Sequence, residues 1–145
     1  MIIGPDLRVE TLDWASASET AIAIRLAVFV AEQRVPLAEE IDSHDPLSEH
    51  ALAYAGGKAV GTGRLLPDGH IGRMAVLAHW RGRGVGAAIL ARLLDRARAR
   101  GFEHALLNAQ THAIGFYAKQ GFEVDGPPFI EAGIAHVQMR LELLR

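Results

Sequence analysis

The chain has 145 residues, enough for one domain with a substantial core but short for two. Its 15 lysines and arginines nearly balance 17 aspartates and glutamates, so no basic excess favours nucleic acid as a partner. The absence of cysteine excludes disulfides, thiolate metal sites and a cysteine nucleophile, and fits a cytoplasmic protein. No apolar run approaches the roughly 20 residues that span a bilayer, so we expect no membrane partner.

The N-terminal part predicts a strand, a helix and a loop. Residues 7–12 alternate apolar and polar side chains, which is the period of a half-buried strand. Ser16 or Ser18 can cap a helix that contains residues 21–29. Residues 33–48, with their acids and two prolines, then indicate an irregular loop.

Three antiparallel strands are predicted next, as a meander. Gly56-Gly57 supplies the positive φ angles of a tight turn between strands at 50–55 and 58–66. Asp68-Gly69 is a second turn signal. Residues 70–76 should therefore be the third strand, and they lead into a glycine-rich segment.

That segment, Arg81-Gly82-Arg83-Gly84-Val85-Gly86, opens a periodic helix at residues 87–100. A strand, a glycine turn and a helix N-terminus leave main-chain N–H groups unpaired at the positive end of the helix dipole, which suits a phosphate or pyrophosphate. The Walker spacing and its lysine are absent. A dinucleotide fingerprint fits the glycines and Ala87, but it should open a parallel βαβ unit rather than follow a meander.

The C-terminal part predicts a mixed arrangement. The apolar strand at 102–109 is reached through a helix, so it should run parallel to the strand at 70–76. A short helix is expected at 112–119. Closing strands are expected at 122–124 and 135–143, separated by a glycine-proline break.

Two motifs resemble those of the GNAT superfamily of acyl-CoA N-acetyltransferases. The glycine-rich segment matches the pyrophosphate-loop pattern Gln/Arg-x-x-Gly-x-Gly/Ala at every fixed position. A second pattern, Ala-x-x-x-Tyr-x-x-x-Gly-Phe, is present as Ala113, Tyr117, Gly121 and Phe122. The N-terminal half is similar to the ElaA-like branch at 28–30, Glu32-Gln33, Val35-Pro36, His50, 60–65 and 72–76.

The resemblance implies an α+β GNAT fold with a mixed, mostly antiparallel sheet of six or seven strands and about four helices. The strands at 70–76 and 102–109 would splay apart so that the pantetheine arm of acetyl-CoA lies between them. Main-chain groups of Met74, Ala75 and Val76 would bond this arm and polarise the thioester carbonyl. The remaining cofactor-binding groups that it implies are Arg81, Gly82, Arg83, Gly84, Val85, Gly86, Ala87 and Gln110, the last at a position where the family often has asparagine.

In the matched motif, Tyr117 looks like the family's general acid, which protonates the coenzyme A thiolate as it leaves. An alkyl amine with a pKa near ~10.4 is mostly protonated at neutral pH, so the acceptor also needs a base. The candidates are Glu32, His50, His112, Glu131 and His136, of which we select Glu32 and His112. A water chain ending on backbone carbonyls is the alternative.

Two groups of charged residues lead to opposite predictions for the charge of the acceptor. An acidic loop would attract a cationic amine; its members are Glu39, Glu40, Asp42 and Asp45. Arg64 and Arg73 lie in strand-like runs, where each needs a partner or lines a cavity and would favour an anionic group. His50 and His136 are further substrate-binding candidates. The seven histidines lack metal-binding spacings, so no metal is expected.

The sequence therefore predicts one N-acetyltransferase domain over residues 1–145. It would transfer an acetyl group from acetyl-CoA to a primary amine of a small molecule by direct attack in a ternary complex. A homodimer is compatible with the sequence but is not established by it. A non-catalytic acyl-CoA-binding sensor and a nucleotide-binding oxidoreductase stay open as alternatives.

Overall fold

The computed structural model describes residues 7–35 and 42–144. The strands are β1 (Leu7–Leu12), β2 (Glu49–Ala55), β3 (Lys58–Leu65), β4 (His70–Val76), β5 (His104–Gln110), β6 (Glu123–Val124), β7 (Phe129–Glu131) and β8 (Ile134–Glu142). The α-helices in these ranges are α1 (Trp14–Arg25), α3 (Val85–Ala99) and α4 (Ile114–Lys119), and a π-helical segment, Leu26–Glu32, continues α1. Short 3-10 helices cover Asp45–Leu47, Ala78–Trp80 and Thr111–Ala113.

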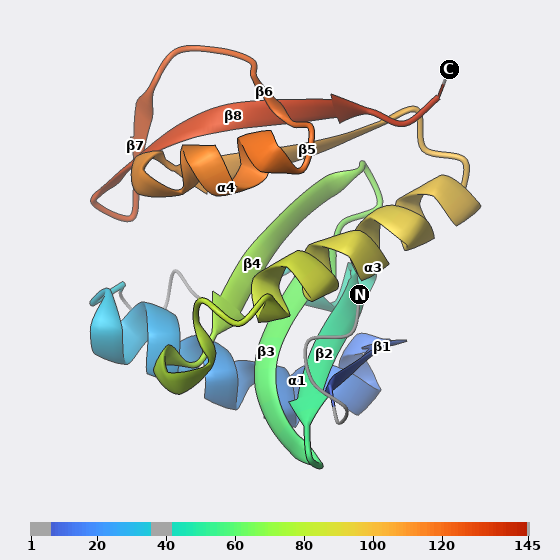
Figure 1. Cartoon of the computed structure of the whole chain (residues 1–145), viewed down its shortest axis with the longest axis vertical. Coiled ribbons are helices and arrows are strands. Elements are labelled where there is room, and N and C mark those ends of the chain that lie inside the picture. Colours follow the sequence, from blue (N-terminus) through green and yellow to red (C-terminus); the bar gives the residue numbers. More distant parts are fainter. Residues whose placement is uncertain (1–6, 36–41, 145) are drawn as a thin grey trace.

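The strands form one mixed sheet in the order β1-β2-β3-β4-β5-β8-β6, with β7 added to β8. β4 and β5 are parallel, and the other described pairs are antiparallel. Figure 1 shows β1–β4 with α1 and α3 in one half and β5–β8 with α4 in the other. The mixed α+β architecture is confirmed. The sheet has eight strands rather than six or seven, because the three residues of β7 pair with β8 directly after the prolines at 127 and 128.

The first helix begins one turn earlier than predicted. Asp13 is its N-cap, and the carboxylate of Asp13 accepts a hydrogen bond from the Ser16 main-chain N–H at 2.9 Å. Ser16 and Ser18 are therefore helical residues and not caps. The cap still follows the general rule, because a short acidic side chain reaches the third helical N–H as well as serine does.

The continuous helical stretch Trp14–Glu32 is also longer than the sequence analysis allowed for. Its 19 residues, with a hydropathy of 1.3, would suffice to cross a membrane by length and composition alone. Glu19 and Arg25 interrupt the apolar residues and conceal this run in the sequence. Its apolar face packs on β2 and β4 through four buried residues, Ala17, Ala21, Ile24 and Val28.

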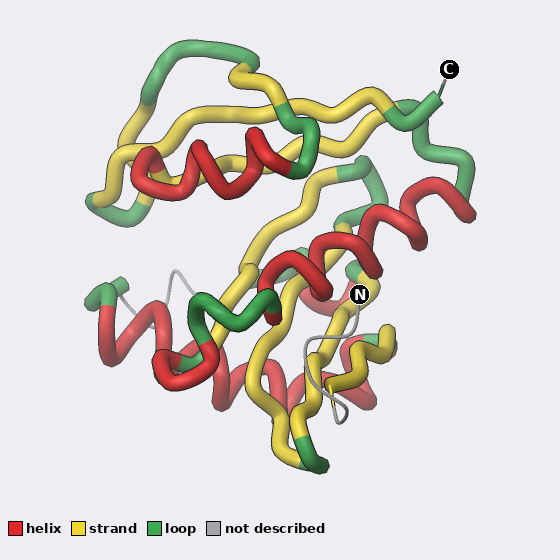
Figure 2. Tube along the Cα trace, viewed as in Figure 1, coloured by secondary structure: helices red, strands yellow, loops and turns green. Residues whose placement is uncertain are grey.

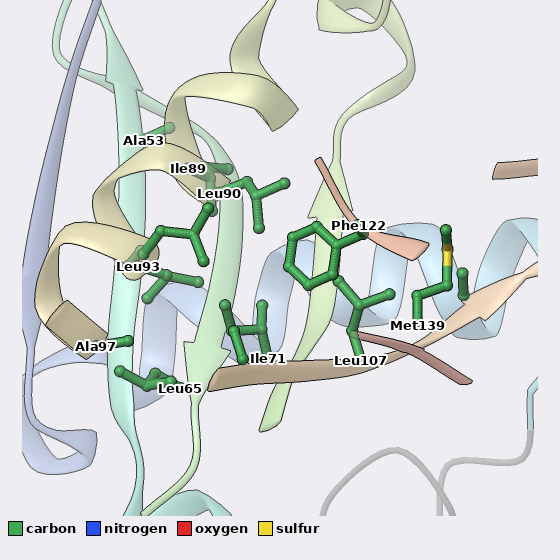
Figure 3. Close-up of a cluster of buried hydrophobic side chains, with 14 of the residues drawn as sticks. Ala53, Leu65, Ile71, Ile89, Leu90, Leu93, Ala97, Leu107, Phe122 and Met139 are labelled. Carbon is green, nitrogen blue, oxygen red and sulfur yellow. The ribbon is translucent and has the colours of Figure 1, made fainter. Parts of the chain in front are cut away.

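The largest core lies between the sheet and α3, on the face opposite α1. Its helical face is that predicted from the periodicity, with Ile89, Leu90, Leu93, Leu94 and Ala97 all buried. These side chains meet Leu65 and Ile71 of the first half of the sheet, and Leu107, Phe122 and Met139 extend the same core into the second half (Figure 3). One apolar core therefore joins both halves.

A small residue on β3 allows α3 to approach the sheet. A Cβ on Gly63 would lie 2.9 Å from Ile89 Cγ2 and 3.1 Å from Leu93 Cδ1. We expect Gly63→Ala to lower the free energy of unfolding by about 1–3 kcal/mol, because Cγ2 of a β-branched residue cannot swing away. Gly115→Ala is the matched control, since a Cβ there meets open space. Urea unfolding of both variants tests this; equal stability would contradict it.

Candidate active site

The site begins where β4 and β5 stop pairing. The two strands pair through His70 with Leu106 and through Ile71 with Leu107. Beyond these pairs they diverge towards their C-terminal ends, as Figure 2 shows. A cleft of about 1230 Å³ lies along this opening. The predicted splay of these strands is therefore confirmed.

β4 carries a bulge at the edge of the cleft, which the sequence analysis did not predict. Thr62 of β3 pairs with Ala75 and Arg64 pairs with Gly72, so Arg73 and Met74 together oppose a single residue of β3. Arg73 has a φ of 48°, which is rare outside glycine. The bulge takes main-chain groups out of the ladder beside the cleft. Three cofactor-binding candidates line the cleft here: Met74, Ala75 and Val76.

The glycine-rich segment forms one end of the cleft. Gly82 and Gly84 have φ values of 74° and 81°, which explains why glycine occupies both positions. Gly84 is the N-cap of α3, and the first helical hydrogen bond runs from Ala88 N to Gly84 O at 3.0 Å. The N–H groups that precede this bond carry the positive end of the helix dipole. They belong to cleft-lining residues, Val85, Gly86 and Ala87.

Both arginines of this segment contact other side chains of the protein. Arg81 Nε donates to the Val76 carbonyl at 3.0 Å, and its guanidinium contacts the Glu32 carboxylate at 2.8 Å. The Arg83 guanidinium lies 4.9 Å from the centre of the Trp80 ring. Glu32 is paired with Arg81 and lies outside the lining of the cleft, so the structure does not place this candidate base at the site.

Tyr117 lies on α4 and lines the cleft. Its ring packs edge-on against Phe116 at 5.0 Å and Phe122 at 6.1 Å between centroids. Burial raises the pKa of Tyr117 to about 12. The phenol therefore keeps its proton at neutral pH, which is the state that a general acid requires.

A pair of glutamines spans the cleft. Gln110 Nε2 donates to Gln33 Oε1 at 2.9 Å, and Gln33 Nε2 donates to Gln110 Oε1 at 3.3 Å. His112 Nε2 donates to the same Gln110 oxygen at 2.6 Å. These bonds join the end of the π-helical segment to the end of β5, and all three side chains line the cleft. The sequence analysis selected Gln110 and His112 but missed Gln33.

The other two histidine candidates differ in position. His50 is buried outside the lining of the cleft, where its Nε2 donates to the Asp45 carbonyl at 2.9 Å. Burial lowers the pKa of His50 and keeps it neutral, so it is a structural residue. His136 lines the cleft, and its Nδ1 donates to the Ile134 carbonyl at 2.7 Å. Glu131 also lines the cleft, with a carboxylate oxygen 3.8 Å from His136 Nε2.

The arginines and acids that led to opposite predictions of substrate charge form a buried network of ion pairs. Arg25 makes two hydrogen bonds to the Asp45 carboxylate, each 3.0 Å long. Arg64 donates to Asp45 at 2.8 Å and to Asp42 at 2.8 and 3.0 Å. Arg73 donates to Asp42 at 3.0 Å. Among the described residues, three guanidinium groups therefore share two carboxylates, and each buried charge has the opposite charge beside it that it needs.

Three members of this network, Asp42, Arg64 and Arg73, nevertheless line the cleft. Burial opposes ionisation of Asp42, but hydrogen bonds and charge from Arg64, with the charge of Arg73, outweigh it and lower the pKa of Asp42 to about 2. The predicted need for arginine partners is confirmed. The other two acids of the predicted loop, Glu39 and Glu40, lie outside the described residues.

Further lining residues escaped the sequence analysis. Asp68 lies in the β3–β4 turn and His70 begins β4, with Asp68 Oδ2 3.0 Å from His70 Nδ1. Asn108 of β5 also lines the cleft. The sequence does contain a signal for this pair, an acid two residues before a histidine with a glycine between them. The sequence analysis used Asp68-Gly69 only to predict the turn. No cluster of metal-ligating side chains occurs among residues 7–35 and 42–144.

Comparison with known proteins agrees with this geometry. The family model of an acetyltransferase (GNAT) domain matches residues 15–143. The uncharacterised N-acetyltransferase YjcF of Bacillus subtilis is 44% identical over 123 residues, which cover 82% of this chain and 88% of that protein.

Solved structures agree as well. An acyl-CoA N-acyltransferase from Pseudomonas aeruginosa is 28% identical with a TM-score of 0.83, covering 93% of this chain and 99% of that one. Escherichia coli ElaA is also 28% identical with a TM-score of 0.83, covering 94% of this chain and 99% of its own. The similarity to ElaA agrees with the branch that the N-terminal motifs indicated. The chain therefore belongs to the GNAT family of acetyltransferases.

Proposed function

We propose that this protein transfers an acetyl group from acetyl-CoA to a primary amine of a small molecule, by direct attack in a ternary complex. The observation that carries the proposal is the position of the cleft between the diverging strands β4 and β5. The N-terminus of α3 lies at one end of the cleft and Tyr117 lines it. An anion site and a proton donor in one cleft suit an acyl donor that carries a pyrophosphate and leaves as a thiolate.

The donor would bind along the α3 end of the cleft. The N–H groups that open α3 would hold the pyrophosphate. Main-chain groups of β4 in the bulge and directly after it, at Met74 and Ala75, would bond the pantetheine arm and polarise the thioester carbonyl. The Val76 carbonyl already accepts one hydrogen bond from Arg81 and has one lone pair left for the donor. Tyr117 would then protonate the departing thiolate.

The acceptor would enter from the α1 side of the sheet, where the lining is polar. Asp68, His70, Asn108 and His136 line this part of the cleft. Arg64 and Arg73 are bonded to the carboxylates of Asp42 and Asp45. An acceptor with a primary amine would therefore meet two histidines, one amide and the Asp68 carboxylate.

Thiol release from acetyl-CoA in the presence of a panel of primary amines tests the proposal. The panel should include spermidine, glucosamine 6-phosphate, phenethylamine and a lysine dipeptide, so that it spans cationic, anionic and apolar acceptors. We expect release that depends on at least one amine, with a thermal shift on adding coenzyme A. If no amine causes thiol release and coenzyme A causes no thermal shift, the proposal is rejected. A thermal shift without release would favour an acyl-CoA-binding sensor.

The variant Gly86→Asp tests whether the N-terminal end of α3 binds a pyrophosphate. Gly86 is the second residue of α3, has no positive φ, and a Cβ there would lie 3.5 Å from Phe116 in ordinary contact. An acid at this position favours the helix dipole but repels a pyrophosphate. We expect acetyl-CoA to bind at least about tenfold more weakly, since like charges ~5 Å apart near a surface repel by ~3 kcal/mol before salt screening.

Gly86→Asn is the matched control, because it adds a side chain of the same size without the charge. Titration calorimetry with acetyl-CoA measures both variants, and thermal unfolding checks their folding. Equal affinities for the aspartate and asparagine variants would show that no phosphate group lies at this helix end.

A further inference from the structure

We propose that His70, beside Asp68, is the general base that takes a proton from the acceptor amine. This inference rests on the proposed function and assigns a residue of β4 to it. Three observations support it. His70 lies on the acceptor face of β4, it contacts Asp68, and the other candidate bases are bonded to other residues or lie farther from β4.

His70 points to the acceptor side of the sheet. Ile71 is buried in the core under α3, so the preceding residue faces the opposite side, because side chains alternate along a strand. The bulge at Arg73 shifts this alternation by one residue, and Ala75 therefore packs on the same side as His70, against Ile24 of α1. The imidazole lines the cleft with its side chain 32% exposed, so it is accessible to an acceptor.

Asp68 holds His70 from the turn that precedes β4. Asp68 Oδ1 accepts the His70 main-chain N–H at 3.0 Å, and Oδ2 lies 3.0 Å from Nδ1 of the ring. The approach to Nδ1 is oblique, so the carboxylate acts mainly through its charge. With Nδ1 beside a carboxylate, Nε2 is the nitrogen left to accept a proton.

Asp68 remains ionised in this position. Burial opposes its ionisation, but the hydrogen bond from the His70 main-chain N–H and the adjacent imidazole outweigh that cost and lower the pKa of Asp68. The other charged groups that line this end of the cleft, Asp42, Arg64 and Arg73, are bonded to one another. A protonated His70 would therefore have the Asp68 carboxylate as its counter-charge.

The remaining candidates are committed to other contacts or lie farther from β4. Glu32 is paired with Arg81, and His112 donates from Nε2 to Gln110. His136 lies on β8, with β5 between it and β4. His70 is on the same strand as the groups proposed to hold the thioester. Met74 lies four positions further along β4, about 13 Å of strand at ~3.3 Å per residue, so water molecules in the cleft would complete the path.

The proton balance of the step is as follows. His70 Nε2 takes one proton from the ammonium form of the acceptor through these water molecules. The neutral nitrogen forms a C–N bond with the thioester carbon, and the C–S bond breaks with its electron pair on sulfur. Tyr117 gives its proton to the sulfur and regains one, through water, from the nitrogen that has become an amide. His70 then releases its proton to solvent.

The test compares His70→Asn with the wild type on two acceptors of the same shape. One is the alkyl amine of the panel with the highest turnover, and the other is its aminooxy analogue, whose nitrogen is already unprotonated at neutral pH. For the alkyl amine we expect kcat/KM to fall by about 10²-fold and the acidic limb of the pH profile to move up towards the pKa of the amine, because the neutral amine must then form in solution. For the aminooxy analogue we expect a loss of less than about threefold, because no proton needs to be removed before attack.

Asp68→Asn should show a smaller loss with the same dependence on the acceptor. His79→Asn is the matched control, since His79 is exposed and lies outside the cleft lining. Equal losses on both acceptors would assign His70 to structure or binding and overturn the proposal. So would a wild-type pH profile for His70→Asn. A wild type that binds coenzyme A but acetylates no amine would instead reject the proposed function and this assignment together.

Discussion

Replacing Tyr117 by phenylalanine is expected to lower kcat by about 10²-fold or more, because general acid catalysis contributes a factor of that order. The phenylalanine ring preserves the edge-on packing against Phe116 and Phe122, so the fold and the cleft should remain. The Kd for acetyl-CoA should therefore stay within about twofold of the wild type. Steady-state kinetics and calorimetry on the same preparations measure the two quantities.

Tyr54→Phe is the matched control. Tyr54 is the chain's other tyrosine and lies on β2, outside the cleft lining. Unchanged turnover in Tyr117→Phe would remove the acid role. A parallel loss of acetyl-CoA affinity would show that the hydroxyl binds the donor instead of protonating its thiolate.

The largest expected effect on stability is that of Asp45→Asn. The Asp45 side chain is 1% exposed and bridges Arg25, also 1% exposed, to Arg64. Removing its charge leaves two buried guanidinium groups without this carboxylate, and breaking a buried pair in this way typically costs about 3–5 kcal/mol. Urea unfolding should show a loss of this size with an unchanged slope.

The control for this variant is Asp95→Asn on α3. The Asp95 side chain is 68% exposed and lies 3.7 Å from Arg98, so its removal should change stability by less than about 1 kcal/mol. The two variants make the same chemical change in different surroundings. Equal losses would mean that the buried network contributes no more than a surface pair.

The same network gives stability a pH dependence of known sign. Ion pairing lowers the pKa of Asp45 and lowers that of Asp42 to about 2, below the ordinary value of 3.8. Their contribution is therefore complete above about pH 5 and is lost as the pH falls towards about 2. The wild type should lose free energy of unfolding over this window, and Asp45→Asn should lose less of it.

The elements predicted correctly are those with a local cause. The turn at Gly56-Gly57 follows from two positive φ values, and the opening of α3 follows from Gly82 and Gly84. The parallel β4–β5 pair follows from the helix that connects the strands. These features depend on a few adjacent residues or on connectivity, so the sequence pattern was sufficient.

Two of the features that were missed depend on residues far apart in the chain. Gln33 and Gln110 are 77 positions apart, and Arg64 and Asp42 are 22 apart. Neither partner identifies the other without the fold. The bulge at Arg73 could not be predicted from the sequence either. Arginine does not favour a positive φ, so the surrounding contacts impose it. For this reason the glycine-rich end of the cleft could be predicted, whereas the glutamine pair and the buried network required the structure.

The divergence of β4 and β5 gives the sheet two internal edges in addition to its outer ones. Beyond Ile71 and Leu107, main-chain groups of both strands face the cleft instead of each other. An open edge normally recruits another extended chain. The pantetheine arm of the proposed donor is such a chain, with amide groups along it. Binding would then complete the sheet with a strand that the polypeptide does not supply, and the donor would hold the two halves of the protein together.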